Sequence, residues 1–71
     1  MRIYCPERIR KRRLKLKLTQ AEVAKRAGTA REYFNEVERG KAIPKVTTLA
    51  KIADALDVRV GYFFVNDVCN N

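Results

Sequence analysis

Residues 19–32 read TQAEVAKRAGTARE, and the expected fold follows from this stretch. The pattern Thr-x-x-Glu occurs in it twice, over residues 19–22 and 29–32. Each copy predicts a helix N-terminus, because the threonine hydroxyl accepts a hydrogen bond from the third backbone amide while the glutamate accepts one from the cap amide. Gly28 stands between the two copies and suits the left-handed backbone that ends many helices. We therefore expect two short helices joined by a tight turn.

The composition indicates one small basic domain over residues 1–71. The apolar fraction of 46% is that of a globular chain, and the net charge is +8. Residues 1–17 hold eight Lys and Arg against one Glu, whereas residues 46–71 hold two against three Asp. A basic front half of this kind predicts a polyanionic partner such as nucleic acid.

The two cysteines and the lack of histidine limit the other classes of site. Cys5 and Cys69 lie near opposite ends of the chain, and a disulfide framework would usually have four or more cysteines. We expect reduced thiols without a specific role, no metal site and no cofactor. The N-terminus has no apolar signal segment, and no apolar stretch is long enough to span a membrane.

Apolar spacing predicts further helices on both sides of the central pair. One runs from Pro6 and Glu7 to about Lys17, with Leu14 among its buried residues and basic side chains over the rest of its surface. Another covers about residues 46–56, with Val46 as the first member of its apolar face. The tail, about residues 58–66, is either a short strand or a fifth helix.

The central pair of helices, about residues 20–39, has the features of a helix-turn-helix unit. That unit needs small residues where its helices cross and a residue that tolerates positive φ at the turn. Ala24 and Gly28 supply these, and the shared core is formed by Val23, Ala27, Phe34 and Val37. In such units the second helix enters the major groove of DNA.

The run LTQAEVAKRAGTAREYFNEVERGKAIPKVTTLAKIADALDV resembles the phage repressor and Cro-type helix-turn-helix family, which includes xenobiotic-response-element regulators. The resemblance extends over about residues 8–64. It implies an all-α, five-helix, lambda-repressor-like domain that binds double-stranded DNA as a homodimer on a pseudo-palindromic operator, with residues 30–39 as the recognition helix. The implied role is a sequence-specific transcriptional regulator, such as a repressor.

The resemblance also implies roles for individual residues. Gln20 would contact a phosphate or a nearby base, and the outer face of the recognition helix would read bases. Arg13 and Glu38 match a pair that family members often bury as a salt bridge, and Lys17 and Asp57 stand where glycine is common. The implied DNA-binding residues are Gln20, Arg31, Glu32, Tyr33, Asn35, Glu36, Arg39, Lys41 and Lys45.

Two glutamates on a helix that faces DNA are unusual, because phosphates repel them. Glu32 and Glu36 can accept a hydrogen bond from cytosine N4, and Arg31 can bind guanine, which favours a half-site containing G·C pairs. Glu32 has a competing task, since it could instead close a capping box with Thr29. The family alignment would place Ala30 at that cap. The basic first helix likewise either contacts phosphate or is only a solvated surface.

The apolar tail is the candidate dimerisation segment, about residues 58–71. Four consecutive large apolar residues cannot all face inward, so part of this run should be exposed to a partner: Tyr62, Phe63, Phe64 and Val65. The alternative function is a protein-interaction module or antitoxin-like accessory protein whose tail docks a partner. An enzyme is not expected, because the chain lacks a nucleophile-base set and a phosphate loop. We expect a cytoplasmic protein, associated with the nucleoid when bound to DNA, without a small-molecule effector.

Overall fold

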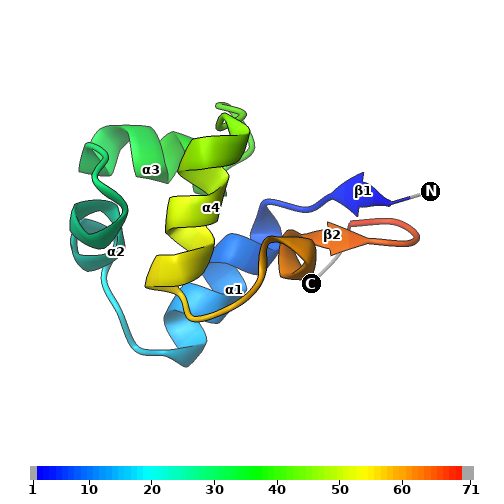
Figure 1. Ribbon diagram of the computed structural model, residues 1–71, viewed down its shortest axis with the longest axis horizontal. Helices are drawn as coiled ribbons and strands as arrows, with labels where there is room; N and C mark the ends of the chain where they lie inside the picture. Colours follow the sequence, from blue (N-terminus) through cyan, green and yellow to red (C-terminus); the bar gives the residue numbers. More distant parts are fainter. Residues whose placement is uncertain (1, 70–71) are drawn as a thin grey trace.

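Four α-helices surround a shared core, and a two-stranded ribbon joins the two ends of the chain (Figure 1). The computed structural model describes residues 2–69. The elements in chain order are β1 (Ile3–Tyr4), α1 (Glu7–Lys15), α2 (Gln20–Ala27), α3 (Arg31–Glu38), α4 (Val46–Ala55), a single 3₁₀ turn (Val60–Phe63) and β2 (Phe64–Val65). The predominantly helical fold class is confirmed, and the tail combines a helical turn with a short strand.

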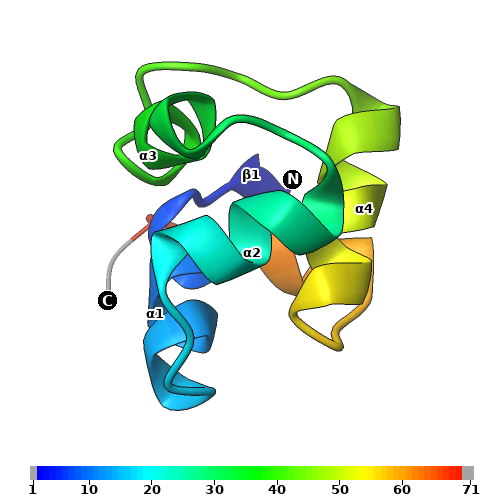
Figure 2. The same ribbon diagram turned by 90° about the vertical axis from the view of Figure 1, so that its left-hand side faces the viewer.

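The core lies where α2 packs against α4 and α3 (Figure 2). Ala24 and Ala27 of α2 and Ala53 of α4 are buried, and their small side chains let the helices approach closely. Aromatic and branched residues fill the remaining space between the helices: Ile9, Val23, Phe34, Val37, Leu49, Ile52, Leu56 and Phe63. Because α3 contributes Phe34 and Val37 to this core, its orientation is fixed by packing.

The first predicted capping box is formed and the second is not. Thr19 Oγ1 accepts from the Glu22 amide at 3.1 Å, and Glu22 Oε1 accepts from the Thr19 amide at 2.8 Å. These bonds lower the pKa of the Glu22 carboxyl from its usual value. At the start of α3 the N-cap is Ala30, with no side-chain hydrogen bond, so the prediction of a cap at Thr29 is wrong. A three-residue turn leaves Thr29 one position too early to cap α3.

Positive φ angles occur at the chain reversals that the sequence indicates. Gly28 (φ 73°) ends α2, and Gly40 (φ 76°) follows α3. Lys17 (φ 58°) and Asp57 (φ 57°) adopt the same left-handed backbone after α1 and α4, at the two positions where the family often has glycine. The structure therefore requires left-handed backbone from two residues that have a Cβ atom, which is a local source of strain.

Two residues expected in the core are exposed. Leu14 is 49% exposed, because Ile9 and Arg13 form the buried side of α1 and Leu14 falls on its outer side. Val46 is 79% exposed, because it begins α4, one turn before that helix reaches the core at Leu49.

Three arginines of the basic N-terminal segment bind backbone carbonyls of the C-terminal segment. Arg12 Nε donates to Leu56 O at 2.9 Å, Arg8 Nη1 donates to Tyr62 O at 3.0 Å, and Arg2 Nη2 donates to the carbonyls of Gly61 and Phe64 at 2.8 and 2.9 Å. Arg8 also lies over the Tyr62 ring, 4.9 Å from its centre. Much of the basic charge before residue 13 therefore holds the fold together.

Cys5 and Cys69 form a disulfide, which corrects the expectation of reduced thiols without a role. Their Cα atoms are 5.2 Å apart, within the range that the bond needs. The sequence gives no sign of this, because 64 positions separate the two residues and only the antiparallel pairing of β1 with β2 brings them together. The pairing consists of Ile3 with Val65 and Tyr4 with Phe64. A ribbon this short is marginal alone, so the disulfide reinforces it.

Candidate nucleic-acid interface

The outer face of α3 is exposed while its inner face is held in the core. Phe34, Val37 and Glu38 are buried, and Arg31, Glu32 and Glu36 are exposed. Because no side chain caps α3, the carboxylate of Glu32 is not engaged in a capping box. Arg31 Nη2 lies 3.9 Å from Glu32 Oε2, and both side chains are well exposed, so this contact contributes little to stability. The face therefore offers both a guanidinium and carboxylates to a ligand.

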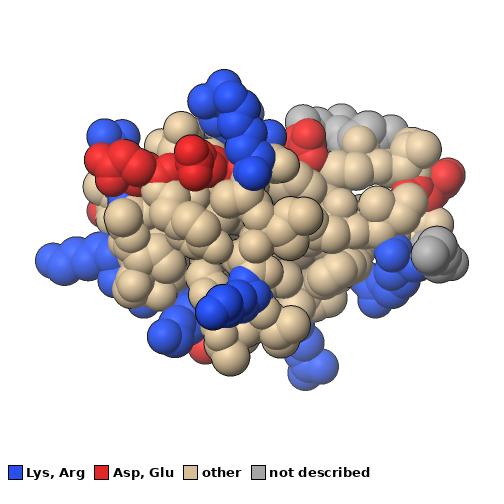
Figure 3. All heavy atoms as spheres, turned by 90° about the horizontal axis from the view of Figure 1, so that it is seen from above, with Lys and Arg blue, Asp and Glu red and all other residues tan. Residues whose placement is uncertain are grey.

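Basic residues follow α3 directly. Arg39 is the C-cap of α3, and the amides of Lys41 and Ala42 both donate to the carbonyl of Glu36, at 2.9 and 3.2 Å. These bonds hold the start of the loop against the end of the helix. Arg39, Lys41 and Lys45 are exposed. Seen from above in Figure 3, acidic and basic side chains lie close together on this face.

The two amide side chains at the junction of α2 and α3 belong to a hydrogen-bonded network. Gln20 Nε2 donates to Asn35 Oδ1 at 3.0 Å and to Glu38 Oε1 at 2.8 Å. Arg13 donates to both carboxylate oxygens of Glu38, from Nε at 2.6 Å and from Nη2 at 3.1 Å. The Glu38 side chain is 1% exposed and that of Arg13 is 10% exposed. The Arg13–Glu38 ion pair matches the salt bridge that the resemblance implies. The hydrogen bonds from Gln20 to Asn35 and Glu38 are not predicted by the sequence, which indicates Gln20 and Asn35 only as separate DNA contacts.

Tyr33 lies half-buried against the core, beside the outer face of α3. It also influences Tyr4, whose hydroxyl is buried and has no hydrogen-bond partner among residues 2–69. Burial, the nearby Tyr33 and Glu7, in that order, raise the pKa of Tyr4 to about 12. Tyr33 is therefore shared between the core and the candidate interface.

The tail residues proposed for dimerisation differ in exposure. Phe63 is fully buried, whereas Tyr62, Phe64 and Val65 are half-buried. Phe64 lines an apolar groove of about 270 Å³ together with Tyr4, Ile43, Pro44, Val46 and Leu49. Ile43 is 83% exposed and Val46 is 79% exposed at its rim. The exposed apolar surface thus extends from the tail to the beginning of α4.

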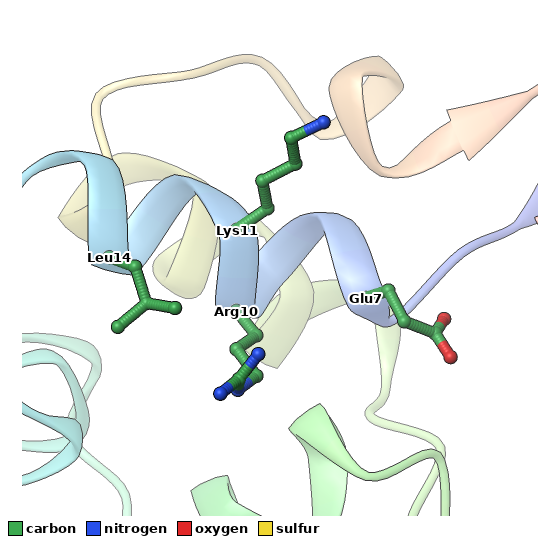
Figure 4. Close-up of a pocket in the computed structure, with 4 residues that line it drawn as sticks. All are labelled: Glu7, Arg10, Lys11 and Leu14. Atoms are coloured by element: carbon green, nitrogen blue, oxygen red, sulfur yellow. The ribbon is translucent and has the colours of Figure 1, made fainter. Parts of the chain in front are cut away.

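A second hollow lies on the outer side of α1, lined by Glu7, Arg10, Lys11 and Leu14 (Figure 4). In the close-up, Lys11 points to the opposite side of the helix from Arg10 and Leu14. Arg10 and Lys11 are exposed, and the hydrogen bonds of the described residues do not involve their side chains. None of the helices in residues 2–69 combines the length and the apolarity that crossing a bilayer requires.

The family model for helix-turn-helix proteins matches residues 9–63. The chain belongs to the helix-turn-helix family. This helix-turn-helix chain is 40% identical over 62 residues to the uncharacterized HTH-type transcriptional regulator YqaF of Bacillus subtilis, a match that covers 87% of the chain and 80% of YqaF. It is 37% identical over 54 residues to the immunity repressor protein of Bacillus phage phi105, of which it covers only 38%.

A solved structure agrees with the sequence match. The crystal structure of the P22 c2 repressor in complex with a synthetic operator superposes with a TM-score of 0.80 at 34% identity, covering 87% of this chain and 94% of that one. The resemblance stated from the sequence is therefore confirmed. This helix-turn-helix protein is a transcriptional regulator with a DNA-binding fold, and its family is not one of enzymes.

Proposed function

We propose that this helix-turn-helix protein binds specific double-stranded DNA sequences by inserting α3 into the major groove. The observation that carries the proposal is that α3 is fixed by buried Phe34 and Val37 while Arg31, Glu32 and Glu36 remain exposed. A major groove is wide enough to admit one α-helix, and a rigidly held helix can present side chains to base edges. The P22 c2 repressor, similar in sequence and fold, is described in complex with an operator.

The exposed residues divide into two proposed roles. Arg31 donates to guanine, while Glu32 and Glu36 accept from cytosine, so each contributes to sequence preference. Arg39, Lys41 and Lys45 bind phosphates, which orients the protein without selecting a sequence. Tyr33 and the amide side chains of Gln20 and Asn35 complete the interface at its edges.

We further infer that the protein acts as a homodimer on a pseudo-palindromic operator, with two copies of α3 about 34 Å apart. The apolar groove that Phe64 of the tail lines together with exposed Ile43 and Val46 supports this inference, because an exposed apolar patch of this kind marks an interface. A two-fold dimer would bury the patch on both copies. Binding to DNA would keep the protein in the cytoplasm, at the nucleoid.

The apolar groove also supports a second candidate, a protein-interaction module in which a different protein occupies it. Sedimentation equilibrium of the wild type and of Val46→Glu separates the two. A dimer that the substitution dissociates supports the homodimer, because Val46 is exposed and its replacement should leave the fold intact. A wild-type monomer at every concentration, with one stoichiometric protein recovered from cells and no DNA bound, would favour the second candidate.

Selection from random duplex DNA tests the main proposal. We expect a pseudo-palindromic consensus to emerge with the wild-type protein. Arg31→Ala should change the consensus, whereas Lys41→Ala should leave the consensus unchanged and weaken binding to all sequences alike. An unchanged consensus for Arg31→Ala and a changed one for Lys41→Ala would overturn the assigned roles.

A further inference from the structure

The network that joins Arg13, Glu38, Gln20 and Asn35 has a fixed hydrogen-bond direction. An ion-paired carboxylate only accepts hydrogen bonds, and Glu38 receives Arg13 on both of its oxygens. Whatever part of Gln20 faces Glu38 must therefore donate, and only the amide nitrogen can do so. The buried ion pair thus determines which way the Gln20 amide is turned.

The hydrogen-bond direction fixed at Gln20 also determines the direction of its bond to Asn35. The nitrogen of Gln20 has a second hydrogen, which it donates to Asn35 at 3.0 Å. The atom of Asn35 that faces it must be the oxygen, because two amide nitrogens would repel each other. An asparagine side chain is otherwise nearly symmetric in shape, so this hydrogen bond alone decides its orientation.

The consequence is that Asn35 turns its nitrogen away from α2. Asn35 is half-buried on the flank of α3, between exposed Glu36 and the first residue of α2. An asparagine that binds adenine in the major groove uses its oxygen and its nitrogen together. Here the oxygen is turned toward α2 by its bond from Gln20, so the group that Asn35 turns outward to a ligand is its nitrogen, a hydrogen-bond donor.

We propose that Asn35 donates to a base edge that presents an acceptor to it, guanine O6 or N7, thymine O4 or adenine N7, and that Gln20 is the positioning residue that imposes this choice. The inference rests on the proposed binding of α3 to DNA, and it specifies one element of the recognised sequence. Cytosine, whose N4 is a donor, is disfavoured opposite Asn35.

The test is the Asn35→Asp variant. Its inner oxygen still accepts from Gln20, whereas its outer atom changes from a donor to an acceptor at nearly constant shape. Base preferences are measured as ratios of the affinities for operators that differ at a single base pair. The added negative charge weakens binding to each operator equally, so its effect cancels in the ratio. At the base that residue 35 faces, we expect cytosine to change from a disfavoured to a favoured base, with a change of at least about fivefold in the affinity ratio of guanine or thymine to cytosine.

Gln20→Leu tests the positioning role separately. Without the amide of residue 20, Asn35 can turn, and we expect discrimination at the same base pair to fall below about twofold or to move to adenine. The matched control is Glu36→Gln, which should change a different base pair. If Gln20 only supported the fold, its replacement would weaken all operators equally and leave their ratios unchanged. If Gln20→Leu does not fold, Asn35→Asp decides alone, since it keeps the internal bond.

The outcomes separate this inference from the function on which it rests. A wild-type protein without any sequence preference overturns both. A sequence-specific wild type whose preferences survive Asn35→Asp at every position overturns the inference and leaves the function standing. A loss of affinity in Asn35→Asp that is equal for all operators, with their ratios unchanged, would also overturn the inference.

Discussion

Arg13 and Glu38 form a bidentate ion pair inside the protein, with hydrogen bonds of 2.6 and 3.1 Å between α1 and α3. Arg13 also donates to the carbonyl of Leu18 at 3.0 Å, and Glu38 accepts from Gln20. Every strong polar group of the pair is thereby satisfied. Because one partner lies on α1 and the other on α3, the pair fixes α3 relative to the rest of the fold.

Replacing one partner of this ion pair should lower the free energy of unfolding far more than replacing both partners. Glu38→Gln leaves the Arg13 charge buried without a counter-charge, and we expect the free energy of unfolding to fall by about 3–5 kcal/mol. Arg13→Met combined with Glu38→Met should recover most of that loss, since two apolar residues of similar size replace the charges. Urea denaturation followed by circular dichroism gives both values. Equal stability of the single variant and the wild type would contradict the buried pair.

Reduction of the disulfide between Cys5 and Cys69 should destabilise the protein by about 2–4 kcal/mol, because the bond closes nearly the whole chain into a loop and restricts the unfolded state. For a domain of this size each kcal/mol corresponds to roughly 4–8 °C in melting temperature. Thermal melts with and without dithiothreitol measure the difference. The control is Cys5→Ser with Cys69→Ser, which should melt at the same temperature in both buffers.

The buried hydroxyl of Tyr4 should make the protein sensitive to alkali. Its pKa of about 12 in the folded state lies above the ordinary value of 10.0, so the folded state holds the proton more tightly. The resulting stability is fully present below pH 10 and is lost as the pH rises toward 12. Tyr4→Phe removes this loss. At pH 8 it should also stabilise the protein by about 1 kcal/mol, because the hydroxyl has no hydrogen-bond partner in the described part of the chain, residues 2–69. Urea denaturation of both proteins at pH 8 and pH 11 tests these signs, and a stability difference independent of pH would refute the titration.

Lys17→Gly should stabilise the protein by about 1 kcal/mol, since glycine adopts a φ of 58° without the Cβ clash of lysine. Lys15→Gly is the matched control. It removes the same charge from the last residue of α1, where glycine is unfavourable, and should destabilise the protein by up to about 1 kcal/mol. The comparison uses urea midpoints, and a loss of stability in both variants would show that Lys17 is not strained.

The parts of the fold that depend on local sequence could be predicted, and the parts that depend on distant contacts could not. The Thr19 cap and the glycine at residue 28 act within one turn of the chain, and both were predicted. The cap at Thr29 was wrong, because the turn length that the core imposes makes Ala30 the cap. The disulfide and the arginine contacts to the C-terminal carbonyls join the two ends of the chain, and no local pattern encodes them.

The candidate site was predicted as a set of residues rather than as a geometry. The spacing on α3 indicates which residues face outward, and Arg31, Glu32 and Glu36 are exposed as expected. The spacing does not indicate that Gln20 bonds to Asn35 and Glu38, because that network depends on how closely α2 approaches α3. The hydrogen-bonded group formed by the buried Glu38 carboxylate and the amides of Gln20 and Asn35 can be recognised only in the three-dimensional structure.

Fluorescence anisotropy measures the proposed sequence-specific binding to DNA directly. A labelled duplex with the selected operator is compared with a scrambled duplex of the same composition over a series of salt concentrations. We predict that at physiological salt the operator binds at least about a thousandfold more tightly than the scrambled duplex. Equal affinity for the two duplexes at every salt concentration would contradict sequence-specific binding.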